Sequence, residues 1–171
     1  MQRAPDTARL FITLWPDDTV RAALRAYRNQ WQWPRAAAAM HSDKLHLTLH
    51  FLGSQPRALV AQLEQALTLP FTPFALDFGH AEVWRHGSAV LEPLALPGAL
   101  LDLHAALATA LDGLGVAVEE RPFRPHVTMG RHASGASAPS APAHIRWPVT
   151  GYALVESQPD HGGYRILRSY R

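Results

Sequence analysis

The chain has 171 residues, 47% hydrophobic and 18% charged, with a formal net charge of +2 and no cysteine. This composition is typical of a globular domain with a sizeable core, and it excludes disulfides and thiolate chemistry. No apolar run reaches the roughly eighteen residues of a membrane helix, and Pro16, Asp17 and Asp18 interrupt the first apolar stretch too early for a secretory signal. We therefore expect one bilobal domain over residues 1–171, no contact with a membrane, and a cytoplasmic location.

The basic residues are nearly all arginine, because Lys44 is the one lysine in the chain. Arginine presents a planar, two-pronged set of donors that suits phosphate. A weakly basic chain is compatible with a phosphate-bearing ligand and does not require a nucleic acid.

The first half of the chain alternates strands and helices. Residues 9–15 are rich in β-branched and aromatic side chains, as in a strand, and the Pro-Asp-Asp at 16–18 ends that strand and offers a helix N-cap. Apolar side chains then recur at helical spacing up to about residue 30. After a linker, the patterns predict a strand over 46–53 and a helix over 54–67.

The second half contains more strands. Alternating residues between 71 and 94, with a turn near Gly87, predict two strands. Leucines at helical spacing predict a helix over 97–115, and the small, proline-rich stretch 133–143 predicts a mobile loop. The remaining strand candidates are a short one around residue 126 and two at 147–157 and 164–170. This order favours an α+β fold with helices packed on largely antiparallel sheets over a doubly wound parallel one.

The strand candidate HLTLHFLG, residues 46–53, carries polar side chains on one face only. Because side chains alternate across a strand, the two faces hold the following sets: His46, Thr48 and His50 on one, Leu47, Leu49 and Phe51 on the other. Two imidazoles and a hydroxyl are costly inside a core unless each finds a partner. The polar face is therefore either an ordinary solvated one or the lining of a site.

A second stretch, HVTMGR at residues 126–131, repeats this pattern. His126 and Thr128 share one face there, as His46 and Thr48 do in the first stretch. One His-x-Thr arises easily by chance, whereas two copies in strand-like contexts, one in each half of the chain, indicate an internal duplication. Each half would then give one strand to a shared cleft.

Two histidines that face each other, with no cysteine and no acidic cluster, point to general acid–base catalysis. Histidine titrates near neutrality, so one imidazole can be neutral while the other is protonated. The neutral ring takes a proton from water and the charged ring gives one to a leaving oxygen. Threonine hydroxyls would hold phosphate oxygens, and an arginine would neutralise charge in the transition state. A phosphodiester fits between two such His-x-Thr pairs without a metal.

The paired motifs HLTLHFLG and PHVTMGR resemble the two signature motifs of the 2H phosphoesterases. The most similar branch is that of the RNA 2′,3′-cyclic phosphodiesterases, also called 2′-5′ RNA ligases. The resemblance extends to RLFITLWP near the N-terminus, EERPFRPHVTMGR before the second motif and LVESQPDHGGYRIL near the C-terminus. It covers residues 9–170, nearly the whole chain.

The resemblance implies two pseudo-symmetric lobes of largely antiparallel sheet, with helices packed outside, flanking a central cleft. His46 would be the proton donor to the leaving 3′ oxygen, and His126 the proton acceptor that activates water. Thr48, Thr128 and Arg131 would bind the phosphate. The reaction would open a 2′,3′-cyclic phosphate at an RNA end to a 2′-phosphate, with 2′-5′ ligation as its reverse. No metal and no cofactor are implied, and we expect a monomer.

Two residues near the motifs raise separate questions. Arg131 lies an odd number of residues from His126, so it reaches phosphate only if the strand ends or bulges; its counterpart in the first motif is Phe51. His50 is expected on the polar face, at the rim of the site. A metal held by His46 and His50 is disfavoured because they would lie about 13 Å apart on a strand.

Several further side chains have two interpretations. Arginines just before the second motif either reach the substrate or are solvated, and three phenylalanines either stack on a base or belong to the core. These residues are Arg121, Arg124, Phe11, Phe51 and Phe123. The other histidines show no partner pattern.

Two other functions remain open from the sequence. One is a phosphodiesterase of the same architecture acting on a small cyclic nucleotide. The other is a non-catalytic module that binds RNA ends, although the presence of both histidines and both threonines argues against loss of catalysis.

Overall fold

The structure is a computed structural model, and it describes residues 6–171 apart from the side chain of His161. The strands are β1 (Thr7–Leu14), β2 (Ala38–Ala39), β3 (Leu47–Pro56), β4 (Phe74–Val83), β5 (Ala89–Pro93), β6 (Val127–Arg131), β7 (Ile145–Val149), β8 (Tyr152–Gln158) and β9 (Gly163–Tyr170). The α-helices are α1 (Asp18–Asn29), α2 (Val60–Ala66) and α3 (Gly98–Gly113). Short 3-10 helices lie at Ser42–Lys44, Arg57–Leu59 and Pro159–His161.

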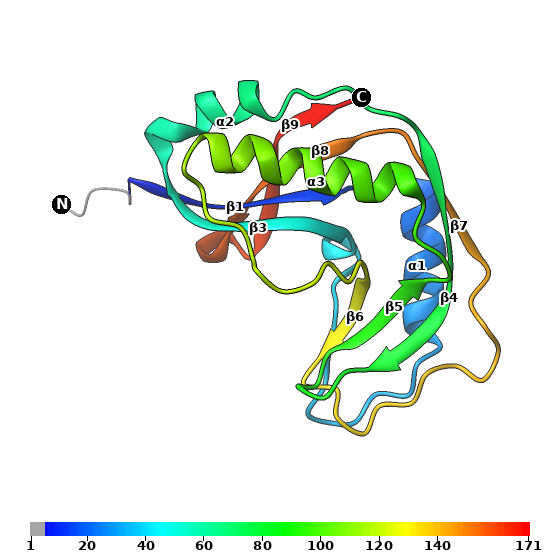
Figure 1. The fold of residues 1–171 in the computed structure, drawn as a ribbon. Coiled ribbons are helices and arrows are strands. Elements are labelled where there is room, and N and C mark those ends of the chain that lie inside the picture. The colour runs from blue at the N-terminus through cyan, green and yellow to red at the C-terminus, as the bar shows by residue number, and fades with distance from the viewer. Residues whose placement is uncertain (1–5) are drawn as a thin grey trace.

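All strands belong to one sheet whose pairings are antiparallel, in the order β7-β4-β5-β6-β3-β1-β8-β9, with β2 paired to β6. The sheet has two halves: β9, β8, β1 and β3 form one, and β6, β5, β4 and β7 form the other (Figure 1). The halves meet at one residue pair between β3 and β6, Leu47 with Val127. This confirms the predicted α+β fold with largely antiparallel strands.

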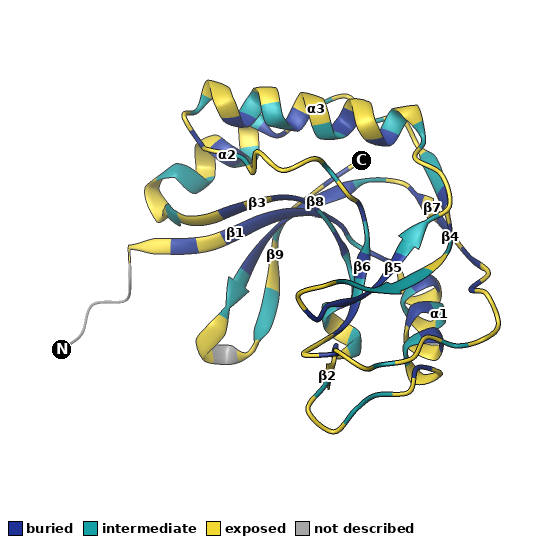
Figure 2. Ribbon diagram, turned by 60° about the horizontal axis from the view of Figure 1, so that its bottom comes forward, coloured by how far each residue is buried: buried dark blue, intermediate teal, exposed yellow. Residues whose placement is uncertain are grey.

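The helices cover the outer faces of both halves. Figure 1 shows α2 and α3 lying over the half that contains β1, β3 and β8, and α1 lying beside β4 and β7 of the other half. Helix α1 begins at the N-cap Asp17, whose side chain accepts a hydrogen bond of 2.8 Å from the Val20 amide. Helix α3 buries the predicted leucine stripe, and Figure 2 shows its exposed residues on the side away from the sheet. None of the helices in the described range is long and apolar enough to span a bilayer.

The prediction of one strand over 147–157 is wrong, because the structure has two strands there, β7 and β8. Strand β7 pairs with β4 at one edge of the sheet, whereas β8 pairs with β1 and β9 in the other half. The chain changes halves at Thr150 and Gly151. A side chain at Gly151 would collide with the backbone carbonyl of Tyr170. The segment predicted as a loop at 133–143 contains no helix or extended strand, and Ser137 exchanges backbone hydrogen bonds with Gln32.

The alternation predicted for 46–53 holds as far as the buried Leu49 and is wrong from His50 onward, because β3 contains a bulge. Ile12 pairs with His50 and Thr13 with Thr48, so Leu49 has no partner on β1. The extra residue turns His50 to the buried side, where 6% of it is exposed, and leaves Phe51 52% exposed.

Strand β6 has the equivalent bulge. Ala89 of β5 pairs with Gly130 and Val90 with Thr128, so Met129 is the extra residue. Both bulges therefore lie three residues after a motif histidine. Arg131 was expected to reach phosphate only if its strand ends or bulges. The bulge at Met129 is such an irregularity, and Arg131 lines the same cavity as Thr128.

Candidate active site

The two motif histidines flank the single pair that joins the half-sheets. His46 directly precedes Leu47, and His126 directly precedes Val127. In an antiparallel pair the residue before one partner lies level with the residue after the other. Each histidine therefore lies across from the threonine of the other motif. A cleft of about 440 Å³ opens here, lined by both histidines, Thr48, Thr128 and Arg131.

The backbone fixes the same tautomer for both imidazoles. Nδ1 of His46 lies 2.6 Å from the carbonyl oxygen of Lys44, and Nδ1 of His126 lies 2.7 Å from that of Arg124. A carbonyl oxygen only accepts hydrogen bonds, so each Nδ1 carries a proton and donates it. Each Nε2 is left for proton transfer, and that of His46 accepts a 2.9 Å hydrogen bond from the Thr48 hydroxyl.

Burial disfavours the doubly protonated, cationic form of both imidazoles and so lowers their pKa values. It lowers the pKa of His46 to about 4, with the Lys44 carbonyl opposing the shift and Arg21, His126 and Arg131 adding to it. Burial also lowers the pKa of His126. Both rings are therefore neutral at neutral pH in the substrate-free protein. A phosphate anion between them would raise both pKa values again.

Positive side chains gather at the cleft without acidic partners. Arg9, Lys44 and Arg131 line it, and within the part of the chain that the structure describes none of them forms an ion pair with a carboxylate. One acidic residue, Glu119, also lines the cleft, and its carboxylate is paired with Arg121. Unpaired cations around a concave surface attract anions and raise their rate of association. The electrostatics of the cleft thus suit a phosphate-bearing ligand.

Aromatic rings surround His46. The ring centroids of Phe11 and Tyr164 lie 5.0 and 5.4 Å from that of the imidazole, and the centroid of Trp15 lies 6.1 Å away. Tyr164 was missed by sequence reasoning, because β9 brings it to the cleft from near the end of the chain and no motif marks it. Phe11 is only 4% exposed and supports the imidazole from below the surface, whereas Phe51 is accessible.

His50 does not lie where the sequence predicted, on the polar face with His46. Its ring stacks on His104 of α3 at 4.0 Å, and His104 stacks on Phe123 at 3.8 Å. This stack forms one wall of a recess of about 430 Å³ that adjoins the cleft and shares Phe51 with it. Burial lowers the pKa of His104 to about 4, and the nearby His50 adds to the shift, so both rings pack as neutral groups.

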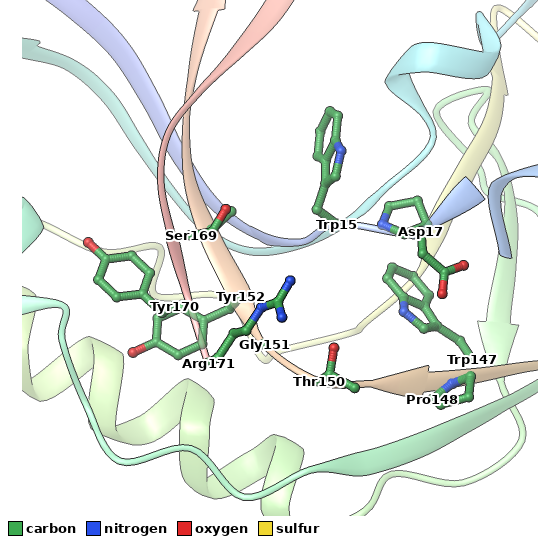
Figure 3. Close-up of a pocket in the computed structure, with 12 residues that line it drawn as sticks. Trp15, Asp17, Trp147, Pro148, Thr150, Gly151, Tyr152, Ser169, Tyr170 and Arg171 are labelled. Carbon is green, nitrogen blue, oxygen red and sulfur yellow. The ribbon is translucent and has the colours of Figure 1, made fainter. Parts of the chain in front are cut away.

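A separate cavity lies at the far side of Trp15. Figure 3 shows it between Trp15, Tyr152, Ser169 and Tyr170, close to the turn that contains Gly151. It contains no motif residue and no histidine. This cavity takes no part in the site formed by the paired motifs.

One group of side chains among the described residues has a spacing that a metal ion would accept. Ligand atoms of His80, Glu82 and Glu92 lie within 4.8 Å of one another. The guanidinium of Arg124 already binds both carboxylates, with three hydrogen bonds of 2.9 Å. The positive charge that a metal would supply is thus present in the chain itself, and none of these residues belongs to a motif.

Sequence comparison identifies the family of the chain. The family model described as the 2′-5′ RNA ligase superfamily matches residues 16–161. The chain belongs to this superfamily. A relative from Thermus thermophilus, named RNA 2′,3′-cyclic phosphodiesterase, is 30% identical over 182 residues, covering 95% of this chain and 89% of the relative. A relative of the same name from Escherichia coli is 30% identical over 164 residues, covering 92% of this chain and 91% of the relative.

Solved structures share the fold. The crystal structure of Escherichia coli LigT complexed with 3′-AMP matches with a TM-score of 0.85 and 27% identity, over 95% of this chain and 97% of that chain. The predicted membership of the 2H phosphoesterases, in the branch of the cyclic phosphodiesterases, is confirmed by these comparisons.

Proposed function

We propose that this protein hydrolyses the 2′,3′-cyclic phosphate at an RNA end to a 2′-phosphate, without a metal or other cofactor. The observation that carries the proposal is the pair of imidazoles that both bind a backbone carbonyl through Nδ1 and line one cationic cleft, which leaves their Nε2 atoms for proton transfer. Two relatives that cover most of this chain are named for this activity.

The proposed reaction is a single displacement at phosphorus. Nε2 of His126 accepts a proton from water as the water oxygen bonds to phosphorus. The bond from phosphorus to the 3′ oxygen breaks, and Nε2 of His46 gives its proton to that oxygen. Each proton transfer contributes a rate factor of about 10²–10⁴. The phosphate remains on the 2′ oxygen.

Three further side chains are proposed to hold the phosphate. Thr48 and Thr128 lie across from the opposite histidines, so their hydroxyls can donate to its non-bridging oxygens. Arg131 would neutralise the charge that grows on these oxygens in the transition state. The base of the terminal nucleotide would pack against Phe51, the exposed ring between the cleft and the recess.

Ligation would use the same groups with a different nucleophile. A 5′-hydroxyl in the place of water would attack the cyclic phosphate, with the same two histidines moving the protons, and would form a longer chain. By microscopic reversibility, the same groups would also cleave a 2′-5′ linkage back to the cyclic phosphate and a 5′-hydroxyl. We therefore propose that 2′-5′ ligation is a property of the same site.

The decisive experiment uses a short RNA that ends in a 2′,3′-cyclic phosphate, with EDTA present. The product is identified by the position of its phosphate. The wild type is expected to give a 2′-phosphate, and His46→Ala and His126→Ala to give none while keeping their circular dichroism spectra. His144→Ala, which replaces an exposed histidine outside the cleft, is the matched control and should be fully active.

The other outcomes separate the alternatives. A 3′-phosphate would contradict protonation of the 3′ oxygen by His46. Loss of activity with EDTA and its return with a divalent metal would contradict the metal-free mechanism. A wild type that binds the RNA without turnover would indicate a binding module.

A small cyclic nucleotide is the second candidate substrate. The unpaired Arg9 and Lys44 favour RNA, because a mononucleotide 2′,3′-cyclic phosphate has only one phosphate for three cations. A dinucleotide ending in the cyclic phosphate should therefore have the higher kcat/KM, and the difference should shrink as salt rises.

We also propose that residues 1–171 act as a single domain and as a monomer. The shared sheet and the cleft between its halves support this, since both motifs come from one chain. Sedimentation at micromolar concentration should give the mass of one chain.

A further inference from the structure

The two motif histidines have matching neighbours. Each donates its Nδ1 proton to a carbonyl two residues earlier, and each packs against a tryptophan. The ring centroid of Trp15 lies 6.1 Å from that of His46, and that of Trp84 lies 4.4 Å from that of His126. Each tryptophan in turn has a guanidinium over its ring. The two halves differ in what holds this guanidinium.

On the His46 side, backbone carbonyls hold the arginine. Arg21 lies 4.9 Å from the centroid of Trp15. Its Nη1 donates to the carbonyl oxygens of Ser42 at 2.6 Å and Leu45 at 3.1 Å. These acceptors are neutral. Asp43 and Asp18 lie near enough to favour the charged form of Arg21, but neither is hydrogen-bonded to it, so this side has no counterpart of a carboxylate bound to the guanidinium.

On the His126 side, two carboxylates hold the arginine. Arg124 lies 4.5 Å from the centroid of Trp84, and its Nε and Nη2 donate to both oxygens of Glu92 at 2.9 Å. Nη2 also donates to Glu82 at 2.9 Å. We call Glu82, Arg124 and Glu92 the carboxylate clamp.

The clamp reaches His126 by two routes. The carbonyl of Arg124 accepts the Nδ1 proton of His126 at 2.7 Å. Trp84 lies against the imidazole, and its indole N–H has no hydrogen-bond partner among the described residues. Packing against Arg124 therefore fixes the place of this ring.

We propose that the carboxylate clamp positions His126 and, through its surplus negative charge, makes this histidine the base of an otherwise symmetric site. Glu82, Arg124 and Glu92 are positioning residues, because they act through Trp84 and a backbone carbonyl rather than on the substrate. The inference rests on the proposed function, in which hydrolysis moves a proton onto His126 and off His46. Glu92 favours that direction because its carboxylate stabilises a cationic ring at His126, and Glu82, by pairing with Arg124, offsets the opposing charge of that guanidinium.

Charges of both signs act on His126, and Glu92 is the one that favours its cationic form. Glu92 opposes the lowering of the His126 pKa by burial, whereas Arg124 and Arg131 add to it. Other titratable or charged groups face this region from the elements around it: His80 and Glu82 on β4, His86 in the β4–β5 turn, Glu119 and Arg121 before β6, His50 on β3, His104 on α3, and Lys44 and His46 across the cleft.

The test measures the pKa of the His126 ring in the substrate-free protein by NMR titration, with His126→Asn to assign the signal. Glu92→Gln keeps the shape of the side chain and removes its charge, so the pKa should fall by about half a unit, roughly threefold in proton affinity. Arg124→Gln removes the positive charge and leaves both carboxylates, so the pKa should rise by a similar amount. A purely structural role would not give shifts of opposite sign.

Further variants separate charge from position. Arg124→Lys keeps the charge and loses the two-pronged contact, so the His126 pKa should stay near that of the wild type while kcat falls about tenfold at unchanged KM. Glu82→Gln should shift the pKa in the same direction as Glu92→Gln, and less, because Glu82 is more exposed, 41% against 12%. This variant keeps the test valid if Glu92→Gln folds poorly.

A second ion pair on β4 supplies the control. Nη1 of Arg146 lies 3.1 Å from both oxygens of Asp77, at the end of β4 that pairs with β7. Arg146→Gln and Asp77→Asn should leave the His126 pKa and kcat unchanged. Shifts of the same sign in Glu92→Gln and Arg124→Gln, or no shift in either, would overturn the proposal. Opposite shifts in a protein that does not hydrolyse cyclic phosphate ends would instead overturn the proposed function.

Discussion

The protonation state of two Nε2 atoms decides how the proposed reaction depends on pH. Hydrolysis needs a proton on His46 and none on His126, yet burial favours the neutral form of both rings in the free protein. Substrate binding must therefore promote protonation of His46, because the phosphodiester anion favours the imidazolium form of this histidine.

The pH profiles of kcat/KM and kcat are expected to differ for this reason. The profile of kcat/KM reports the free enzyme, so it should be bell-shaped with its maximum below about pH 6.5 and fall at higher pH. The profile of kcat reports the complex, in which the phosphate raises the His46 pKa, so its alkaline limb should lie at higher pH. Steady-state kinetics from pH 4.5 to pH 9 measure both, and coinciding alkaline limbs would contradict the role of the phosphate.

Phe51 is the exposed aromatic residue for which the structure favours a binding role. Removing the ring with Phe51→Ala should raise KM about tenfold with little change in kcat, because base stacking is worth about 1–3 kcal/mol. Leu101→Ala is the control, since Leu101 is a similarly exposed apolar side chain on α3, outside the cleft. An unchanged KM in Phe51→Ala, measured with the cyclic-phosphate RNA, would show that the base packs elsewhere.

At the scale of the elements, the connection between β7 and β8 depends on a residue without a side chain. Gly151→Ala would force a methyl group against the Tyr170 carbonyl, so the free energy of unfolding should fall by about 1–3 kcal/mol. A methyl group added at Gly113, the last residue of α3, would meet no atom of a neighbouring element within 4 Å. Gly113→Ala should therefore leave stability unchanged or raise it by about 0.5 kcal/mol. Urea unfolding of both variants measures this difference. Equal stability of the two variants would show that the end of β9 can move away from the added methyl group with no loss of free energy of unfolding.

The sequence predicted the elements better than it predicted which way their side chains point. Leucines at helical spacing located α3, and two His-x-Thr repeats located the strands that the structure brings together. The bulges at Leu49 and Met129 escaped prediction because neither residue type marks a bulge, and each one reverses the faces of the residues that directly follow it. His50 was therefore placed on the wrong side, and the orientation of Arg131 depended on a bulge that only the structure reveals.

Contacts distant in sequence were the other limit of prediction. Tyr164 reaches His46 only because β9 pairs with β8, and the clamp on Arg124 exists only because β4 and β5 pair side by side. Glu82, Glu92 and Arg124 are ordinary surface residue types, and no local pattern links them. Their arrangement follows from sheet topology rather than from spacing along the chain.

At the scale of the whole molecule, four histidines with lowered pKa values couple folding to pH. The pKa values of His46, His50, His104 and His126 all lie below the ordinary value of 6.5. The unfolded chain takes up protons first as pH falls below 6.5, so the native state loses stability between there and about pH 4, where His46 and His104 begin to titrate in the fold.

Urea unfolding at pH 7.5 and pH 5 should therefore show a lower midpoint at pH 5. His104→Phe keeps a ring between His50 and Phe123 and removes one titrating group. The loss of stability between the two pH values should be smaller in this variant than in the wild type. A midpoint that is equal at both pH values in the wild type would contradict the coupling.

The single Leu47–Val127 pair bears on how the site is encoded along the sequence. Because each motif histidine lies level with the threonine of the other motif, each end of the cleft is built from both halves. The half-sheet that contains β1 and β3 also includes β8 and β9, which follow the second motif in the sequence, so it is not formed by one continuous stretch of chain. A nonsense mutation before the codons of β8 and β9 would remove strands from the half that carries the first motif. The two halves of the site therefore cannot be divided into two separately encoded units.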